Sequence, residues 1–215
     1  RTIAHNDLKG GHGLDLITLD GEEHLIHVDG GWHQTEPSAW EWERTNGSVT
    51  ILRKDGTIRL HLPSPHELGV FTEDERYQPC DVAITPDNDI LVADGYASDR
   101  ILHYKSDGTL VCIWGGPDPG APSHLQNAHG ISIGTGEQLP ESGFVLILDQ
   151  ATHRVLSAPG GTEPTYVDGQ LQPMHQAQPI FKHVHDLYVD AAGDIYVGEW
   201  NSGNRYPYKL ELIRP

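Results

Sequence analysis

The chain has 215 residues, with 14 Lys and Arg against 31 Asp and Glu, and its formal net charge is −17. A surface this acidic repels phosphate polyanions, which argues against nucleic acid and anionic membrane surfaces and favours cations and cationic ligands. No apolar run approaches the roughly 20 residues of a membrane helix, so membrane insertion is not expected. The length suits one domain, and the sequence leaves the oligomeric state open.

In chain order, the first segment with strand periodicity is "HGLDLITLDGEEHLIHVDGG", residues 12–31. It predicts a short alternating strand, a polar turn and a second apolar strand. An insertion over residues 31–47 follows, and it carries Trp32, Trp40 and Trp42. These indoles either line a binding rim or pack within their own loop. The strands "SVTIL" and "TIRLHL" then complete a unit of four strands.

This unit recurs along the chain. Further copies occupy residues 80–115, 129–157 and 185–204. In every copy the second strand ends in an acid, and these acids are Asp29, Asp94, Asp149 and Glu199. The copy at residues 80–115 gives a four-stranded antiparallel meander, which matches a β-propeller blade in length and strand count. We therefore predict an all-β fold and a single β-propeller domain over residues 1–215 with four blade-like repeats. Residues 158–183 fit no blade, and they are either a long loop or the remnant of a missing region.

A histidine stands at the head of the first strand in three copies, at His12, His129 and His185. In a propeller the first strand of each blade lies innermost, so equivalent positions meet near the central axis. Three neutral imidazoles around one point form an open zinc site, with a fourth tetrahedral position left for water or substrate. The alternative is that each histidine bonds a channel water or a backbone carbonyl.

The second copy has Cys80 at the equivalent position. A thiolate there would close the zinc site, but a buried small apolar side chain is the preferred interpretation. Cys80 and Cys112 are the only cysteines, so the chain has one disulfide or none. Strand alternation places Asp186 opposite His185. A carboxylate there suits Ca²⁺ together with backbone carbonyls such as that of Leu14, or it caps a turn.

The second copy and the three histidines together resemble the NHL-type β-propeller of peptidyl-α-hydroxyglycine α-amidating lyase. The similarity covers most of residues 10–157 and 183–204, and its most specific features are the histidines and "DGY" at residues 94–96. "ILVADGYASDRI" is less specific, because it is typical of many binding propellers. The family is six-bladed, and it cleaves the C–N bond of a peptidyl-α-hydroxyglycine to give a peptide amide and glyoxylate. The resemblance implies a secreted or periplasmic location.

The resemblance also assigns roles to single residues. It implies zinc ligands at His12, His129 and His185, a catalytic base at Tyr96, and a calcium site at Asp186 and the carbonyl of Leu14. This chemistry is consistent, because zinc is a Lewis acid and a phenol within reach can move the hydroxyl proton as the C–N bond breaks. The alternative for Tyr96 is an aromatic side chain on the rim of a turn.

The chain departs from the family at several positions. The family has an arginine directly after Asp149, where this chain has Gln150, and a second family arginine lies in an upstream region that this chain hardly contains. We take Gln150 and Arg100 as the candidate substrate-binding residues. Losing two cations weakens the hold on a substrate carboxylate, so an altered substrate is expected. The positions of a family disulfide hold Tyr77 and Ala97, so that bridge is absent.

Three functions remain open from the sequence. The first is a zinc-dependent, lyase-like enzyme. The second is a non-catalytic NHL propeller that binds a peptide or small ligand and keeps a structural metal, and the third is another metal-assisted propeller hydrolase with a water nucleophile. The histidines favour an enzyme. Because residues 129–185 leave too little room for an extra blade, the chain is either a smaller propeller or part of a six-bladed one.

Overall fold

The computed structural model of the chain contains only β-strands as regular elements in the part that it describes. That part comprises residues 8, 10–36, 41–116, 125, 128–131, 139–141, 144–148, 154–172, 174, 177–178, 180–181, 184–190, 192–199 and 207–211. These residues include no helix with the length and apolarity needed to cross a membrane. The chain divides into two compact units, residues 1–113 and 114–215, which are described one at a time. A single domain over residues 1–215 stays a prediction.

The first sheet is the four-stranded meander predicted for the first copy, in the order β1-β2-β5-β6. Its strands are β1 (Leu14–Leu19), β2 (Glu22–Asp29), β5 (Ser48–Leu52) and β6 (Ile58–His61), all antiparallel. The β1–β2 hairpin turns at Asp20 and Gly21, whose φ angles are 54° and 79°. Positive φ at both central residues is the geometry that matches the twist of a tight hairpin, and it explains the "DG" of this turn.

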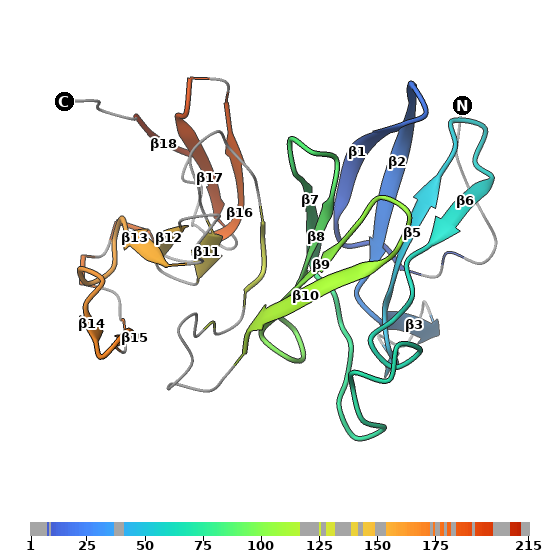
Figure 1. The fold of residues 1–215 in the computed structure, drawn as a ribbon, viewed down its shortest axis with the longest axis horizontal. Helices are drawn as coiled ribbons and strands as arrows, with labels where there is room; N and C mark the ends of the chain where they lie inside the picture. Colours follow the sequence, from blue (N-terminus) through green and yellow to red (C-terminus); the bar gives the residue numbers. More distant parts are fainter. Residues whose placement is uncertain are drawn as a thin grey trace. The chain divides into compact units, whose positions relative to one another are not determined.

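The second sheet follows the same plan in the order β10-β9-β8-β7. Its strands are β7 (Asp81–Ile84), β8 (Ile90–Asp94), β9 (Arg100–Tyr104) and β10 (Leu110–Gly115). The two sheets share one core, in which Ile26 and Ile51 of the first pack with Val92 and Leu102 of the second. The first strands β1 and β7 lie side by side, as in Figure 1. Inner strands meet in this way in neighbouring propeller blades.

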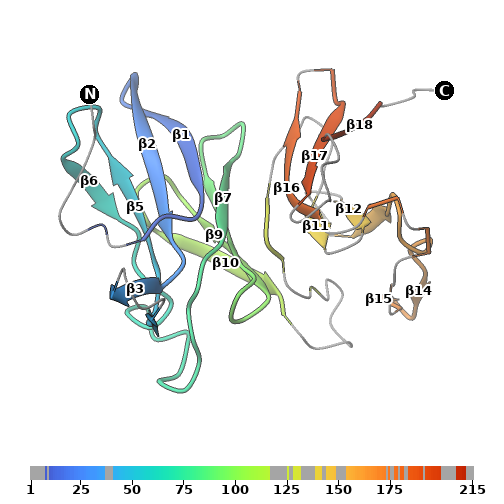
Figure 2. The ribbon, with the colours of Figure 1, turned by 180° about the vertical axis from the view of Figure 1, so that it is seen from behind.

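The insertion in the first copy forms a hairpin of its own, β3 (Trp32–Glu36) and β4 (Glu41–Arg44). It leaves the sheet after β2 and returns at β5. Figures 1 and 2 both show β3 beyond one end of the first sheet, next to the long connection that leads from β6 to β7. The insertion therefore lies at one end of the blade and does not interrupt the order of its four strands.

Within its described residues, the second unit has two sheets of three strands each and one small hairpin. Its strands are β11 (Leu139–Glu141), β12 (Phe144–Leu148), β13 (Val155–Ser157), β14 (Tyr166–Val167), β15 (Gln170–Leu171), β16 (Val184–Val189), β17 (Ile195–Glu199) and β18 (Tyr208–Leu210). Each recognised copy thus corresponds to one antiparallel sheet. The hairpin β14–β15 lies within the segment that fits no blade. The all-β, β-propeller prediction is confirmed.

Asp94 ends β8 and is fully buried. Its carboxylate accepts a hydrogen bond from the backbone N of Gln78 at 2.6 Å and another from the hydroxyl of Ser98. These bonds favour the charged form, but burial outweighs them and raises the pKa of Asp94 from 3.8 to about 7. Asp94 therefore ties the β8–β9 loop to Gln78 through a carboxyl group that titrates near neutral pH.

The raised pKa of Asp94 predicts a pH dependence of stability. Between pH 3.8 and about 7 the folded protein holds a proton that the unfolded chain releases, so stability falls as the pH rises through this window. We expect the melting temperature of the wild type to rise, relative to that of Asp94→Asn, by roughly 3 to 10 °C between pH 8 and pH 5. Differential scanning calorimetry of both proteins measures this. A difference independent of pH would contradict it.

Candidate active site

His12 lies at a bulge at the head of the first blade. The backbone N of His12 bonds the carbonyl of Val28 at 2.8 Å, and the N of Val28 bonds the carbonyl of Gly13 at 2.9 Å, so two residues oppose one. Such bulges turn a side chain out of the regular alternation of a strand, and they are common beside active sites. The backbone bulge therefore sets the direction of the His12 side chain.

The two ring nitrogens of His12 have different partners. Nδ1 lies 2.6 Å from the carbonyl oxygen of Cys80, and Nε2 lies 3.0 Å from the hydroxyl of Tyr96. Because a carbonyl only accepts, Nδ1 carries the proton and Nε2 carries the lone pair. Metal-binding histidines show the same arrangement, in which the second ring nitrogen donates to a carbonyl. The chemistry of this imidazole fits a metal ligand.

Close packing around Gly13 explains why a glycine follows the histidine in this copy. A Cβ atom at Gly13 would lie 2.6 Å from Oδ1 of Asp81 and 2.9 Å from the carbonyl oxygen of Cys80. Any larger residue would push the inner strands of the two blades apart. The same close approach brings the carbonyl of Cys80 within reach of the His12 ring.

Tyr96 lies in the β8–β9 loop, two residues after Asp94, and is half-buried. Its ring meets that of His12 edge to face, with the centroids 5.1 Å apart. Burial raises the pKa of Tyr96 above its ordinary value of 10, so the phenol is protonated at neutral pH and donates to Nε2 of His12. The structure thus brings together one predicted zinc ligand and the predicted catalytic residue, which are 84 positions apart.

The two other predicted zinc ligands belong to the second unit. His129 is half-buried between the buried residues Ala128 and Ile131, and most of the strand predicted after it lies outside the described residues. His185 is the extra residue of a β-bulge, because Val184 pairs with Glu199 and Asp186 with Gly198. Two of the three predicted ligands, His12 and His185, therefore occupy bulges at the heads of equivalent strands.

The zinc and calcium sites stay predictions. Among the residues whose side chains are described, no three His, Cys, Asp or Glu lie together in an arrangement that could hold a metal, and the side chains of His185 and Asp186 are outside that set. The bulge also breaks the alternation from which the opposite-face placement of Asp186 was inferred. Leu14, the predicted carbonyl donor to calcium, begins β1 with its side chain 63% exposed.

Cys80 is fully buried, which agrees with the preferred interpretation. Burial raises the pKa of its thiol to about 12, so the thiol is protonated and unreactive at neutral pH. Cys80 and Cys112 are both free, so of the two options, one disulfide or none, the structure has none.

Of the two candidate substrate-binding residues, only Arg100 is described. It begins β9, forms an ion pair with Glu75 at 2.9 Å, and lies over the ring of Phe71 at 4.9 Å. Its charge is therefore matched by a carboxylate within the first unit. Gln150 lies outside the described residues. The substrate-binding role of both stays a prediction.

Arg44 and Gln78 are two residues at this site that the sequence did not reveal. Nε of Arg44 donates to Oε1 of Gln78, and Nη2 donates to the carbonyl oxygen of Tyr96 at 2.8 Å. The Arg44 guanidinium also lies 5.1 Å from the centroid of the Trp32 ring. The insertion hairpin is thereby joined to the loop that carries Tyr96. Pairing between aromatic and basic positions across the insertion is the one signal in the sequence that could have identified Arg44.

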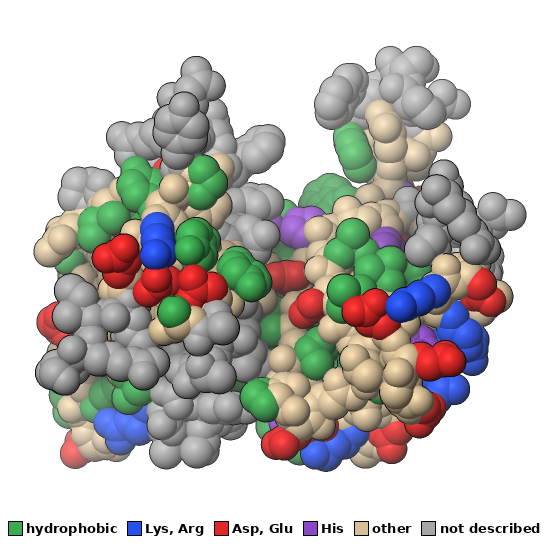
Figure 3. Space-filling model, turned by 90° about the horizontal axis from the view of Figure 1, so that it is seen from above, with side chains coloured by type: hydrophobic (Ala, Val, Ile, Leu, Met, Phe, Trp, Pro, Cys, Tyr) green, Lys and Arg blue, Asp and Glu red, His purple; other side chains and the backbone are tan. Residues whose placement is uncertain are grey.

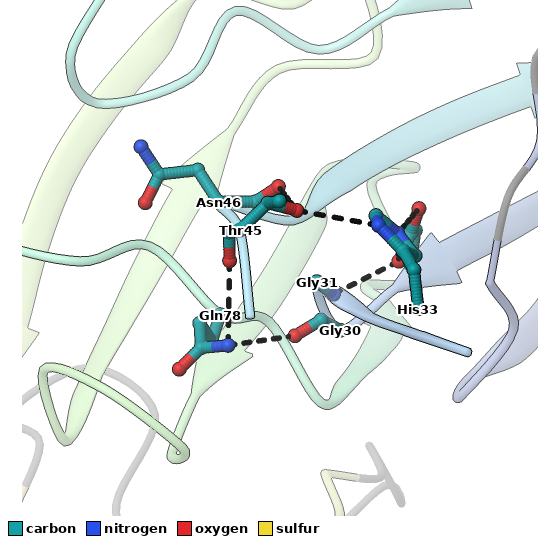
Figure 4. Close-up of polar contacts among 7 residues, drawn as sticks. Gly30, Gly31, His33, Thr45, Asn46 and Gln78 are labelled. Atoms are coloured by element: carbon teal, nitrogen blue, oxygen red, sulfur yellow. Dashed lines mark hydrogen bonds and ion pairs between the residues drawn. The ribbon is translucent and has the colours of Figure 1, made fainter. Parts of the chain in front are cut away.

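Gln78 is fully buried and holds the two ends of the insertion together. Figure 4 shows its amide nitrogen directed at the carbonyls of Gly30, at 3.2 Å, and Thr45, at 3.4 Å. Beside it, Asp29 accepts a bond from the N of Gly31 at 2.8 Å and binds Nε2 of His33 at 3.0 Å. These bonds satisfy buried polar groups at the base of the hairpin and fix its direction.

On the face drawn in Figure 3, acidic and basic side chains are mixed rather than divided into patches. In the described part of the face shown in Figure 3, the Lys and Arg side chains lie among the more numerous acids. This agrees with the net charge of −17. The guanidinium of Arg44, which is held near Tyr96, is therefore a local positive charge on a protein that is acidic as a whole.

No family model matches this chain. It is 28% identical over 117 residues to a probable peptidyl-alpha-hydroxyglycine alpha-amidating lyase from Caenorhabditis elegans, a match that covers 53% of this chain and 32% of that protein. The chain thus spans about a third of the length of this curated relative. The similarity supports a relationship between this chain and a family of propeller proteins. It does not establish the lyase activity.

Two solved structures show similarity to this chain. A protein of unknown function from Bacteroides caccae has a TM-score of 0.50 at 12% identity, over 94% of this chain and 61% of that one. A gluconolactonase from Xanthomonas campestris has a TM-score of 0.49 at 18% identity, over 93% of this chain and 58% of that one. The first of these likenesses concerns the fold alone, and the second supports no further conclusion.

Proposed function

We propose that the protein is a zinc-dependent propeller enzyme that cleaves a C–N bond in the manner of peptidyl-α-hydroxyglycine α-amidating lyase, on an altered substrate. The observation that carries the proposal is the contact between His12 and Tyr96, in which Nε2 faces the phenol and Nδ1 is held by Cys80. A ligand held in one tautomer beside a proton-transfer group is what metal-assisted proton chemistry requires.

Three histidines would hold the zinc ion, and they are His12, His129 and His185. When bound, zinc supplies a Lewis acid that stabilises negative charge on a substrate oxygen. His12 fits this role because its lone-pair nitrogen is not the one that bonds the backbone. His185 fits because its bulge sets it apart from the regular strand, as the bulge at His12 does.

Tyr96 would move the proton in the reaction. Cleavage converts the group NH–CH(OH)–COO⁻ into an amide NH₂ and glyoxylate, so one hydroxyl proton must travel to the nitrogen as the C–N bond breaks and the new C=O bond forms. The phenolic oxygen of Tyr96 is suited to this transfer because its loop is fixed by Arg44 and by Asp94. Its ring packs edge to face against that of His12.

Glyoxylate release from a peptidyl-α-hydroxyglycine tests the proposal. We expect slow turnover by the wild type, and about tenfold faster turnover by Gln150→Arg, because a guanidinium holds a carboxylate more strongly than a neutral amide does. Arg59→Gln, on an exposed strand of the first blade, is the control and should leave the rate unchanged. If purified protein contains zinc and yet none of the variants releases glyoxylate, the reaction is a different one.

We also propose a calcium site at Asp186 and the carbonyl of Leu14. It rests on the family resemblance and on the preference of Ca²⁺ for carboxylate and carbonyl oxygens. We expect added Ca²⁺ to raise the melting temperature of dialysed wild type by a few degrees, roughly 3 °C, and to leave Asp186→Ala unchanged. Asp190→Asn, which alters the turn after the same strand, should keep the response. No shift in the wild type would contradict the site.

A further inference from the structure

One face of the β3–β4 hairpin combines indoles with a guanidinium. Trp32 pairs with Arg44 and Gln34 with Trp42, and residues directly opposed in antiparallel strands project to the same face. Trp32 is 43% exposed and Trp42 is 49% exposed, and Arg44 is exposed as well. The hairpin therefore offers apolar aromatic surface beside a cation.

The side chain of Arg44 is fixed by several contacts, although it is exposed to solvent. Its Nε and Nη2 are bonded to Gln78 and to the carbonyl of Tyr96, and its plane lies near the Trp32 ring. Gln78 in turn is fully buried and bonded at both ends of the hairpin. The Arg44 side chain is thus already ordered in the free protein. This preorganisation reduces the entropic cost of binding a ligand.

The charge of Arg44 is not matched by a carboxylate. Its partners in the described structure are an amide oxygen, a backbone carbonyl and an indole, all of them neutral. Arg59 and Arg100 of the same unit, by contrast, are paired with Asp20 and Glu75. Nη1 of Arg44 has no bonding partner among the described residues. The positive charge of the guanidinium is therefore not neutralised by a carboxylate among the described residues, and its Nη1 group is available to donate to a ligand.

We propose that Arg44 and Trp32 form a binding subsite for a small carboxylate ligand whose adjoining apolar group lies on the indoles. A guanidinium edge matches a carboxylate with two parallel hydrogen bonds, and an aromatic face covers apolar surface. A chain of net charge −17 repels anions in general, so a local cation is needed to admit one. The contact of Arg44 with the Tyr96 carbonyl places the subsite beside Tyr96. Its use in catalysis rests on the proposed function, whereas ligand binding does not.

Calorimetric titration with two matched probes tests the subsite. N-acetylphenylalanine carries a carboxylate, and N-acetylphenylalaninamide has the same apolar part without the charge. We expect the wild type to bind the acid at least tenfold more tightly than the amide, and Arg44→Gln to bind the two within twofold of each other. Arg44→Lys should retain part of the preference, because it keeps the charge and loses the planar fork. Arg59→Gln should match the wild type.

Trp32→Ala separates the two halves of the subsite. It should weaken binding of both probes by a similar factor and keep the preference for the acid, so it supports the inference even if Arg44→Gln loosens the hairpin. A wild type that binds neither probe, or an Arg44→Gln variant that keeps the full preference, overturns the inference. A carboxylate preference in protein that lacks zinc or releases no glyoxylate leaves the subsite standing and removes only the proposed reaction.

Discussion

Replacing His12 by Ala is expected to lower the zinc content of the purified protein at least tenfold and to abolish glyoxylate release. In the proposed site three imidazoles hold the zinc ion, and losing one leaves two, which hold zinc much more weakly at neutral pH. His129→Ala should have the same effect, because it removes another of the three proposed ligands. Zinc per chain, measured by mass spectrometry after dialysis, gives the result directly.

Two controls separate metal binding from structure. His12→Asn keeps an amide donor close to the place of Nδ1, so the bond to the Cys80 carbonyl can persist while the lone pair of Nε2 is lost. It should lose zinc as His12→Ala does, with a smaller fall in melting temperature. His61 is exposed and bonds the hydroxyl of Thr50, so His61→Ala should keep both zinc and activity. Full zinc content in His12→Ala would remove His12 from the site.

Much of the fold could be predicted because each blade is a local pattern. Alternating apolar residues and "DG" or "DN" turns define four antiparallel strands within about 40 residues, without long-range information. The first two blades follow these predictions strand by strand. The hairpin β14–β15 was not predicted, although its turn at Asp168 and Gly169, with φ angles of 50° and 82°, has the same chemistry as the turn at Asp20 and Gly21.

The candidate site was predictable only in part. Equivalent positions in a repeat converge by symmetry, and this reasoning led to His12. Tyr96 was predicted from the family resemblance, and the structure shows the contact between the two residues. Bulges break that reasoning, since an added residue changes the face of every side chain that follows, and the sequence alone does not locate them. The bulge at His185 is such a case.

Arg44 shows a second limit of sequence reasoning. It lies in an insertion outside the repeat, so no equivalent position in another blade points to it. Its place beside Tyr96 depends on Gln78, a buried residue between blades whose partners include Arg44, Asp94 and Gly30 from three separate segments. A lone Gln before "PC" carries no signal of that kind. Contacts of this sort arise from tertiary packing and appear only when the chain is folded.

Replacing Tyr96 by Phe is expected to lower the rate of glyoxylate release by about 10² to 10⁴-fold, the usual contribution of a positioned proton-transfer group. The substitution removes one oxygen and leaves the ring that packs against His12, so zinc content and KM should stay close to the wild-type values. Because wild-type turnover is expected to be slow, the comparison is best made in the Gln150→Arg background as well.

Tyr104→Phe is the matched control for this substitution. Tyr104 is a fully buried tyrosine of the same sheet, and its hydroxyl donates to the carbonyl of Pro63 at 3.0 Å. Losing that bond should lower the melting temperature and leave kcat unchanged, since the Pro63 carbonyl loses its hydrogen-bond donor and has no part in the proposed reaction. Unchanged activity in Tyr96→Phe would remove the tyrosine from the mechanism. A large fall in both variants would instead indicate damage to the blade, because no proton-transfer role is proposed for Tyr104.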